Sequence, residues 1–269
     1  MKKKRKLVQL ICAVLYNCHI TGFAKGTIYQ GSLKSACIPG LNCYSCPGAV
    51  FSCPLGSLQS ALVSSKYRFP YYMLGVLLLF GILLGRIICG FLCPFGLVQE
   101  LLYKIPSKKL KKSCWTRRLS YLKYVILAVF VIGIPLINLT PGFCKYICPA
   151  GTLEGGIPLL IKNESLRQLA GGLFQWKVLL LTGILLSSVF IFRFFCRFFC
   201  PLGAFYGLFH KFALFGVRID EEKCNNCGAC IRHCKMDVKK VGDAECIQCG
   251  ECIGTCHACA LKYVKNKTF

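Results

Sequence analysis

The stretch RFFCRFFCPLG, residues 193–203, ends a long apolar segment with two cysteines, a proline and a glycine. A matching stretch, RIICGFLCPFG at residues 86–96, ends a second apolar segment. Both contain the pattern Cys-x3-Cys-Pro-x-Gly, which we call a cysteine box. Proline suits the first position of a helix, and the residue before it then lies at the helix cap. The second cysteine of each box is therefore predicted to lie at a helix N-terminus, where free N–H groups and the helix dipole favour an anion.

Two further boxes make this pattern an internal repeat. The sequence CKYICPAG at residues 144–151 is a complete box after another apolar segment. The sequence SCPLG at residues 52–56 is a partial box, preceded by Cys46 and Pro47 rather than by a cysteine at position 49. Four boxes thus follow four apolar segments.

The apolar segments are long enough, or nearly so, to cross the ~30 Å of hydrocarbon in a bilayer, which takes about 20 residues. They are residues 7–23, 69–88, 119–139 and 173–195. The chain is 55% hydrophobic and 16% charged, whereas soluble domains carry about 25% charged residues. We therefore expect four transmembrane helices in a lipid bilayer. A signal-peptidase site at residues 22–24 stays open as an alternative to retention of the first segment.

Lys and Arg in short loops indicate the side of the membrane on which each loop lies. Residues 2–6 are all basic, and the loop at residues 104–118 carries seven Lys or Arg and no acid. The other two loops are less basic, so both termini are predicted to be cytoplasmic. The formal charge of +24 follows from this topology and is partly offset where cysteines ionise to bind metal. No nucleic acid is needed as a partner.

The second and fourth segments are predicted to end on the cytoplasmic side, which brings their boxes to one face. Together these boxes supply the four thiolates that hold one [4Fe-4S] cluster; they are Cys89, Cys93, Cys196 and Cys200. Arg86 and Arg193 each precede the first cysteine of their box by three residues. We expect them to hydrogen-bond cluster sulfurs and raise the reduction potential. The alternative is that their long side chains reach out to the membrane surface.

The first and third boxes are predicted on the exported side, where six cysteines are available. By analogy with the cytoplasmic side, we expect a cluster held by Cys46, Cys53, Cys144 and Cys148. The rival is a local set of Cys37, Cys43, Cys46 and Cys53. Disulfides are a third alternative, because exported cysteines often pair.

The last fifty residues contain two runs of the form Cys-x2-Cys-x2-Cys-x3-Cys. This is the bacterial two-cluster ferredoxin pattern, in which the fourth cysteine of each run ligates the other cluster. One [4Fe-4S] cluster would take Cys224, Cys227, Cys230 and Cys256; the second would take Cys246, Cys249, Cys252 and Cys234. The proline usual after each fourth cysteine is replaced by Lys235 and His257.

These patterns together predict two domains. Residues 1–215 are expected to form an all-α membrane domain of four transmembrane helices, and residues 216–269 a small α+β two-cluster ferredoxin domain in the cytoplasm. The chain would carry two [4Fe-4S] clusters in the ferredoxin domain and one or two more in the membrane domain. His19, inside the first segment, is a candidate quinone contact, with a bond to a backbone carbonyl as the alternative.

The sequence resembles the membrane polyferredoxins of the NapH/MauN type. The residues that carry the resemblance are CGFLCP, CKYICP, CRFFCP and NCYSCPGAVFSCPLGSLQ, the last at residues 42–59. The resemblance implies a prokaryotic inner-membrane protein that carries electrons between the quinone pool, or a cytoplasmic donor, and an exported redox partner. Two other functions stay open: a quinol dehydrogenase with its own quinone pocket, and an accessory protein that supplies electrons for maturation or regulation of a redox enzyme.

Overall fold

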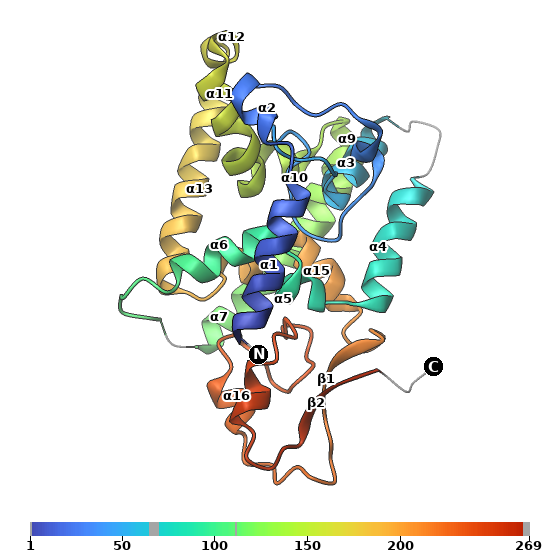
Figure 1. Cartoon of the computed structure of the whole chain (residues 1–269), viewed down its shortest axis with the longest axis vertical. Coiled ribbons are helices and arrows are strands. Elements are labelled where there is room, and N and C mark those ends of the chain that lie inside the picture. The colour runs from blue at the N-terminus through green and yellow to red at the C-terminus, as the bar shows by residue number, and fades with distance from the viewer. Residues whose placement is uncertain (1, 65–69, 111, 266–269) are drawn as a thin grey trace.

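The computed structural model describes residues 2–64, 70–110 and 112–265. Figure 1 shows a helical body with a C-terminal region of short helices and loops packed against one end of it. In the described chain the only strands are β1 (Phe215–Ile219) and β2 (Leu261–Lys265), which pair antiparallel with Phe215 opposite Lys265. The chain is therefore mostly helical with one small sheet, in keeping with the coarse fold class that the sequence predicts.

The helices of the body are mostly short. In chain order they are α1 (Lys2–Tyr16), α2 (Ile20–Lys25), η1 (Ser32–Ser35), α3 (Pro54–Ser64), α4 (Tyr71–Leu83), α5 (Ile87–Phe91), α6 (Pro94–Leu102), α7 (Cys114–Leu119), α8 (Leu122–Ile126), η2 (Leu127–Gly133), α9 (Ile134–Asn138), α10 (Gly142–Tyr146), η3 (Gly151–Gly156), α11 (Ile157–Lys162), α12 (Glu164–Gln168), α13 (Gly172–Phe190), α14 (Phe194–Phe198) and α15 (Pro201–Leu208). The C-terminal region adds α16 (Ala229–His233) and η4 (Glu251–Thr255).

The three complete boxes share one backbone pattern. Each apolar helix ends one to three residues before a residue with a left-handed backbone, namely Gly85, Leu139 or Arg193, with φ of 49°, 51° and 51°. A five-residue helix then carries the first cysteine of the box: α5, α10 or α14. In two boxes the second cysteine, Cys93 or Cys200, is extended at the N-cap of a helix that begins with proline. The predicted cap position is confirmed for these two cysteines.

Two helical stretches of the described chain are long and apolar enough to cross a membrane. They are Cys114–Asn138, with 25 residues and a mean hydropathy of 2.1, and Gly172–Phe190, with 19 residues and a mean hydropathy of 1.7. They correspond to the predicted segments 119–139 and 173–195. The segment 7–23 is divided between α1 and α2, and α4 covers only 13 residues of the segment 69–88, whose residue 69 lies outside the described chain. Four spans therefore stay a prediction.

Buried ion pairs fasten the C-terminal region to the helical body. Arg5 of α1 binds Glu100 of α6 and Glu251 of η4, with N–O distances of 2.7 and 3.2 Å. Lys123 and Arg86 both bind Glu245, and Arg197 pairs with Asp237. Their basic side chains are at most 4% exposed. Because a buried charge without its partner is costly, these pairs fix the position of the C-terminal region on the body.

Candidate iron–sulfur centres

Four buried thiols from two boxes meet beside the C-terminal region. They form the proximal set, which is Cys89, Cys93, Cys196 and Cys200, each at most 8% exposed. Burial raises the pKa of the Cys93 thiol to about 12, and the nearby thiols of Cys196 and Cys89 add to the increase. Cys200 likewise has its pKa raised by burial and then by the other three thiols. The structure thus brings together the four cysteines that the sequence assigns to one cluster.

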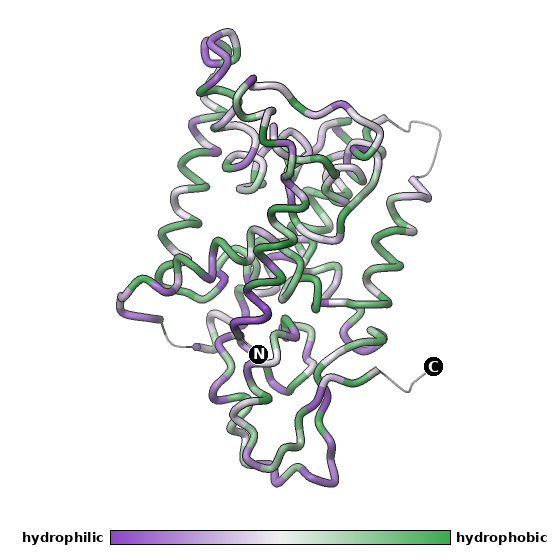
Figure 2. The backbone as a smooth tube through the Cα atoms, viewed as in Figure 1, coloured by the Kyte–Doolittle hydropathy of each residue, from purple (hydrophilic) through white to green (hydrophobic). Residues whose placement is uncertain are grey.

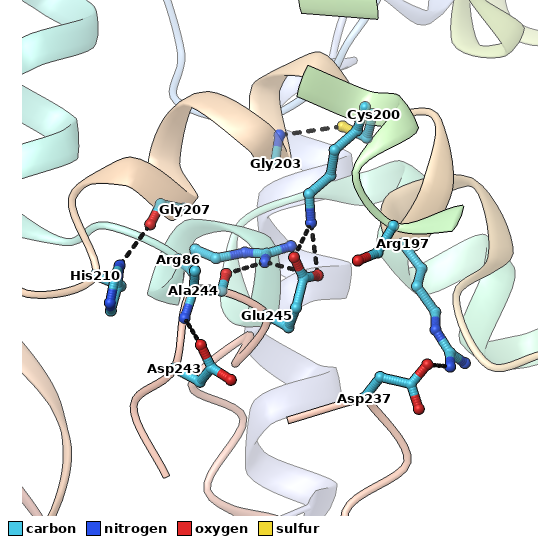
Figure 3. A network of polar contacts seen from close by, with 12 residues as sticks. Arg86, Arg197, Cys200, Gly203, Gly207, His210, Asp237, Asp243, Ala244 and Glu245 are labelled. Atoms are coloured by element: carbon cyan, nitrogen blue, oxygen red, sulfur yellow. Dashed lines mark hydrogen bonds and ion pairs between the residues drawn. The ribbon is translucent and has the colours of Figure 1, made fainter. Parts of the chain in front are cut away.

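The two arginines that precede these boxes are buried rather than extended to the surface. Arg193 donates to Glu100 from Nη2 and Nε, at 2.6 and 2.9 Å, and from Nη1 to the carbonyl of Cys89. Arg86 donates from Nη1 to the carbonyl of Ala244 and to Glu245 (Figure 3). Within the described chain, Nη2 of Arg86 has no hydrogen-bond partner. This donor lies next to Gly203 of the fourth box, and its charge acts on Cys196.

A second group of thiols lines a cavity of about 930 Å³. It forms the distal set, which is Cys43, Cys53, Cys144 and Cys148. Burial raises the pKa of Cys144 to about 12, with Cys53 as the next contribution. Burial also raises the pKa of Cys148 strongly, followed by the effects of Cys144 and Cys43. In Figure 1, α3 and α10, which adjoin this set, lie farther from the strands than α5 and α15 do.

Cys46 and Cys37 do not line this cavity. The sulfur of Cys46 contacts Oδ1 of Asn17 at 3.6 Å, and that of Cys37 contacts Ser57 and Met73 at 3.5 and 3.4 Å. Cys43 instead lies against Gly151, the last residue of the box of Cys148, and against Gly155. The structure therefore groups Cys43, rather than Cys46, with three of the cysteines expected on that side.

A short segment and one tyrosine connect the two sets. The backbone of Leu41 hydrogen-bonds to the thiol of Cys93, and the backbone of the next residue, Asn42, hydrogen-bonds to Cys53. Tyr206 is fully buried and lies within electrostatic range of Cys53 as well as of the proximal thiols. The proximal and distal sets are therefore close neighbours inside the helical body.

The C-terminal region forms two small cavities lined by cysteines. One is lined by Cys224, Cys227, Cys230 and Cys256. The other is lined by Cys234, Cys246, Cys249 and Cys252. Each cavity therefore combines three cysteines of one run with the last cysteine of the other run.

The grouping of these thiols in sets of four suits [4Fe-4S] clusters. No disulfide joins any of the 22 cysteines, all of which lie in the described chain. Within that chain, no three Cys, His, Asp or Glu side chains could hold a single metal ion, whose ligands must converge to about 2.3 Å from one point. A cluster needs four thiolates spread around a larger body, and coordination removes their protons outright. The unpartnered Nη2 of Arg86 adds a buried cationic donor at the proximal set.

Sequence reasoning missed several buried polar residues near the sets. Glu100 joins Arg5 and Arg193, and Glu154 accepts a hydrogen bond from the backbone N–H of Cys43 at 2.8 Å. Burial raises the pKa of Glu154 to about 7. Gln59 and Gln99 donate to cysteine sulfurs. The sequence did contain a pattern that could have revealed three of them: Gln59, Gln99 and Glu154 each follow the second cysteine of a box by six residues.

Comparison with known proteins gives the family. A 4Fe-4S binding domain matches three times, at residues 69–113, 124–162 and 173–219, and a second 4Fe-4S binding domain matches residues 217–240. The methylamine utilization ferredoxin-type protein MauN of Paracoccus denitrificans is 30% identical over 66% of this chain and 58% of its own length. This chain belongs to the MauN-type ferredoxin family.

Other relatives of this MauN-type ferredoxin come from distant organisms. The putative electron transport protein YccM of Escherichia coli K12 is 25% identical over 68% of the chain and 50% of its own length. The protein MJ0750 of Methanocaldococcus jannaschii is 29% identical over 78% of the chain and 85% of its own length. The chain therefore spans little more than half the length of MauN and YccM. No solved structure gives a significant match.

The fourth ligand of the distal set can be identified by a pair of serine variants. Cys43→Ser should lower the iron content by about four per chain, because [4Fe-4S] clusters take four thiolates. Cys46→Ser, matched in chemistry and only three residues away, should keep all the iron. Anaerobic iron and sulfide analysis checks this, and iron loss in the Cys46 variant alone would reverse the assignment.

The carboxylate of Glu100 should be important for stability. Burial favours the protonated form, but Arg193 and Arg5 outweigh it and hold the pKa of Glu100 at about 2. The pair therefore stabilises the fold fully above the ordinary pKa of 4.5 and loses this effect as pH falls toward 2. Glu100→Gln leaves two buried guanidinium groups without a carboxylate and should cost about 3–5 kcal/mol.

Glu164→Gln is the matched control for Glu100→Gln. Glu164 pairs with Arg167 at 2.9 Å, but both side chains are more than half exposed, so its loss should cost at most about 1 kcal/mol. Thermal unfolding of the detergent-solubilised variants, followed by circular dichroism, compares the two. Equal melting temperatures would show that the buried network contributes no more than a surface pair.

Proposed function

We propose that this chain is a membrane-bound electron-transfer protein that passes electrons through a series of [4Fe-4S] clusters to or from a redox partner. The supporting observation is the unbroken series of four cysteine sets: two in the C-terminal region, then the proximal set, then the distal set. The clusters supply one-electron transfer when bound, and the protein sets their spacing and potential. The proposed domains are residues 1–215 and 216–269.

The contact between the C-terminal region and the proximal set is close. A Cβ atom on Gly90, the neighbour of Cys89, would lie only 2.4 Å from the carbonyl oxygen of Ile247. Ile247 lies between Cys246 and Cys249, which line one of the two C-terminal cavities. Only glycine permits this approach. Cys89 and Cys246 therefore lie on backbone segments in direct contact, which suits electron transfer between their two clusters.

The proximity of the proximal and distal sets bears on how an electron could pass between clusters at opposite faces of a membrane. Clusters at opposite faces of a bilayer would be separated by most of ~30 Å of hydrocarbon. Here Leu41 and Asn42, adjacent in sequence, each contact a cysteine of a different set. The box helices would therefore dip into the bilayer, so that both clusters lie within the protein interior and no long step is required.

The surface of the helical body suits a lipid environment. Figure 2 shows hydrophobic residues along α4 and α13, and hydrophilic residues concentrated at the ends of the body and in the C-terminal region. Exposed apolar side chains include Ile137 at 80%, Leu179 at 66% and Leu10 at 53%. Such surfaces are unfavourable in water and favourable in hydrocarbon. This supports the proposed location in a membrane. The prokaryotic inner membrane is proposed from the family resemblance, and cytoplasmic termini from the distribution of Lys and Arg.

A quinone or quinol is the proposed small-molecule partner at the distal set. The cavity of about 930 Å³ has the size typical of small-molecule sites, and it extends beyond the cysteines to Tyr72, Met73 and Lys177. His19 does not line it; its ring contacts the carbonyl of Pro47 at 3.0 Å. If quinol binds in this cavity and is oxidised there by the distal cluster, the chain is a quinol dehydrogenase. If a client protein docks there instead, the role is electron supply for maturation or regulation.

Removal of the proximal cluster tests the series. Cys200→Ser should lose about four irons and keep both clusters of the C-terminal region. In protein reduced with dithionite, oxidation of the C-terminal clusters by ubiquinone-1 should slow at least tenfold, because the distal cavity is disconnected. Cys114→Ser, which changes an exposed cysteine of α7 outside all four sets, should behave like wild type.

Stopped-flow absorbance and freeze-quenched EPR measure these rates. An unchanged rate in Cys200→Ser, with the iron loss verified, would show that quinone oxidises the C-terminal clusters directly. The proposed series would then be wrong, whereas unchanged iron would instead refute the ligand assignment.

A further inference from the structure

Two glutamines occupy the same position in two different boxes. Gln59 follows Cys53 by six residues, and Gln99 follows Cys93 by six residues. Both side chains are completely buried, although an amide is costly to bury unless its hydrogen bonds are satisfied. The hydrogen-bond partners of these two amides therefore indicate the role of a glutamine at this position.

The two glutamines make the same contacts across their box pairs. Nε2 of Gln99 donates to the sulfur of Cys196 at 3.1 Å, and its Oε1 accepts from the backbone N–H of Phe195 at 2.9 Å. Nε2 of Gln59 donates to the sulfur of Cys144 at 3.3 Å, and its Oε1 accepts from Phe143 at 2.9 Å. In each case the glutamine that follows one box donates a hydrogen bond to the first cysteine of the facing box.

The remaining two boxes carry different residues at this position. The third box has Glu154, which accepts from the backbone N–H of Cys43 at 2.8 Å. The fourth has Tyr206, which donates to the carbonyl of Pro39 at 3.1 Å. The proximal and distal sets therefore each have one glutamine that donates to a ligand sulfur. If these glutamines only filled space, their amides would not be expected to donate to the equivalent sulfur in both box pairs.

We propose that Gln59 and Gln99 are paired positioning residues that raise the reduction potentials of the distal and proximal clusters, respectively. This inference rests on the cluster binding proposed above. A cluster gains negative charge on reduction, and a hydrogen bond to a ligand sulfur stabilises that charge. The effect is strong here because the donor is buried, where hydrogen bonds to charge are less weakened by water. The hydrogen bond that Oε1 accepts from the backbone holds the amide in place, so that Nε2 stays directed at the cysteine sulfur.

Two substitutions at Gln99 separate the donor from the acceptor. Gln99→Glu keeps an oxygen for the N–H of Phe195 but removes the donor to Cys196. Gln99→Leu removes both contacts without adding charge. In both variants the ratio of reduced to oxidised proximal cluster at a fixed solution potential should fall about tenfold, which is ~59 mV for a one-electron couple. The same substitutions at Gln59 should shift only the distal cluster.

EPR-monitored redox titration, together with iron analysis, measures these shifts. The C-terminal clusters serve as an internal reference. Full iron content with unchanged potentials in the Gln99 variants would overturn the inference. So would loss of about four irons in Gln99→Leu, because the residue would then hold the cluster rather than tune it. A wild-type protein without iron would instead refute the proposed function itself.

Discussion

The structure depends on bringing helix N-termini into the protein interior to face one another. The proximal and distal sets each contain cysteines from two boxes, and in the proximal set Cys93 and Cys200 both cap helices that begin with proline. The backbone N–H of Gly203 points to the sulfur of Cys200, and that of Gly151 points to Cys148. Buried negative charge is tolerated only where such donors and dipoles surround it. The short helices and left-handed residues before each box follow from this requirement.

The second constraint is the compensation of buried charge around the proximal set. Arg193 has a left-handed backbone, which is unfavourable for a residue with a side chain, and its guanidinium is held by Glu100 and the carbonyl of Cys89. Glu100 also binds Arg5, which in turn reaches Glu251 of the C-terminal region. One connected network thus stabilises the break before the box and attaches the C-terminal region. The geometry of the proximal set and the docking of the C-terminal region are therefore linked.

Much of the site could be predicted because its determinants are local or follow from topology. The cysteines of the C-terminal region have fixed spacing, and the proximal set follows once two apolar segments are taken to end on the same side. The distal set is different, because its fourth thiol comes from the long loop before α3. Cys46 precedes a proline and therefore imitates a box, but the loop places Cys43 against Gly151 and Gly155. Only the folded path of that loop distinguishes the two.

The lengths of the helices and the partners of the buried polar side chains also could not be predicted from the sequence. Hydropathy gives the extent of an apolar segment, but α4 ends at Leu83 because Gly85 turns the backbone into the left-handed region. The partners of Gln59 and Gln99 lie 85 and 97 residues away, and no local pattern specifies such contacts. The repeat of six residues between cysteine and glutamine was visible, but without the structure it had no chemical meaning.

The two sets in the helical body have different surroundings, which under the proposed function suit different tasks. The proximal set is enclosed by ion pairs and lies against the C-terminal region through Gly90 and Ile247, so its environment suits exchange of electrons with other clusters. The distal set borders a large cavity and has a buried carboxyl, Glu154, rather than an arginine network. A site that must admit a substrate or partner has to remain open, and a site that only relays electrons does not. Under the proposed function, a substrate or partner would therefore reach the protein at the distal set, whichever way the electrons flow.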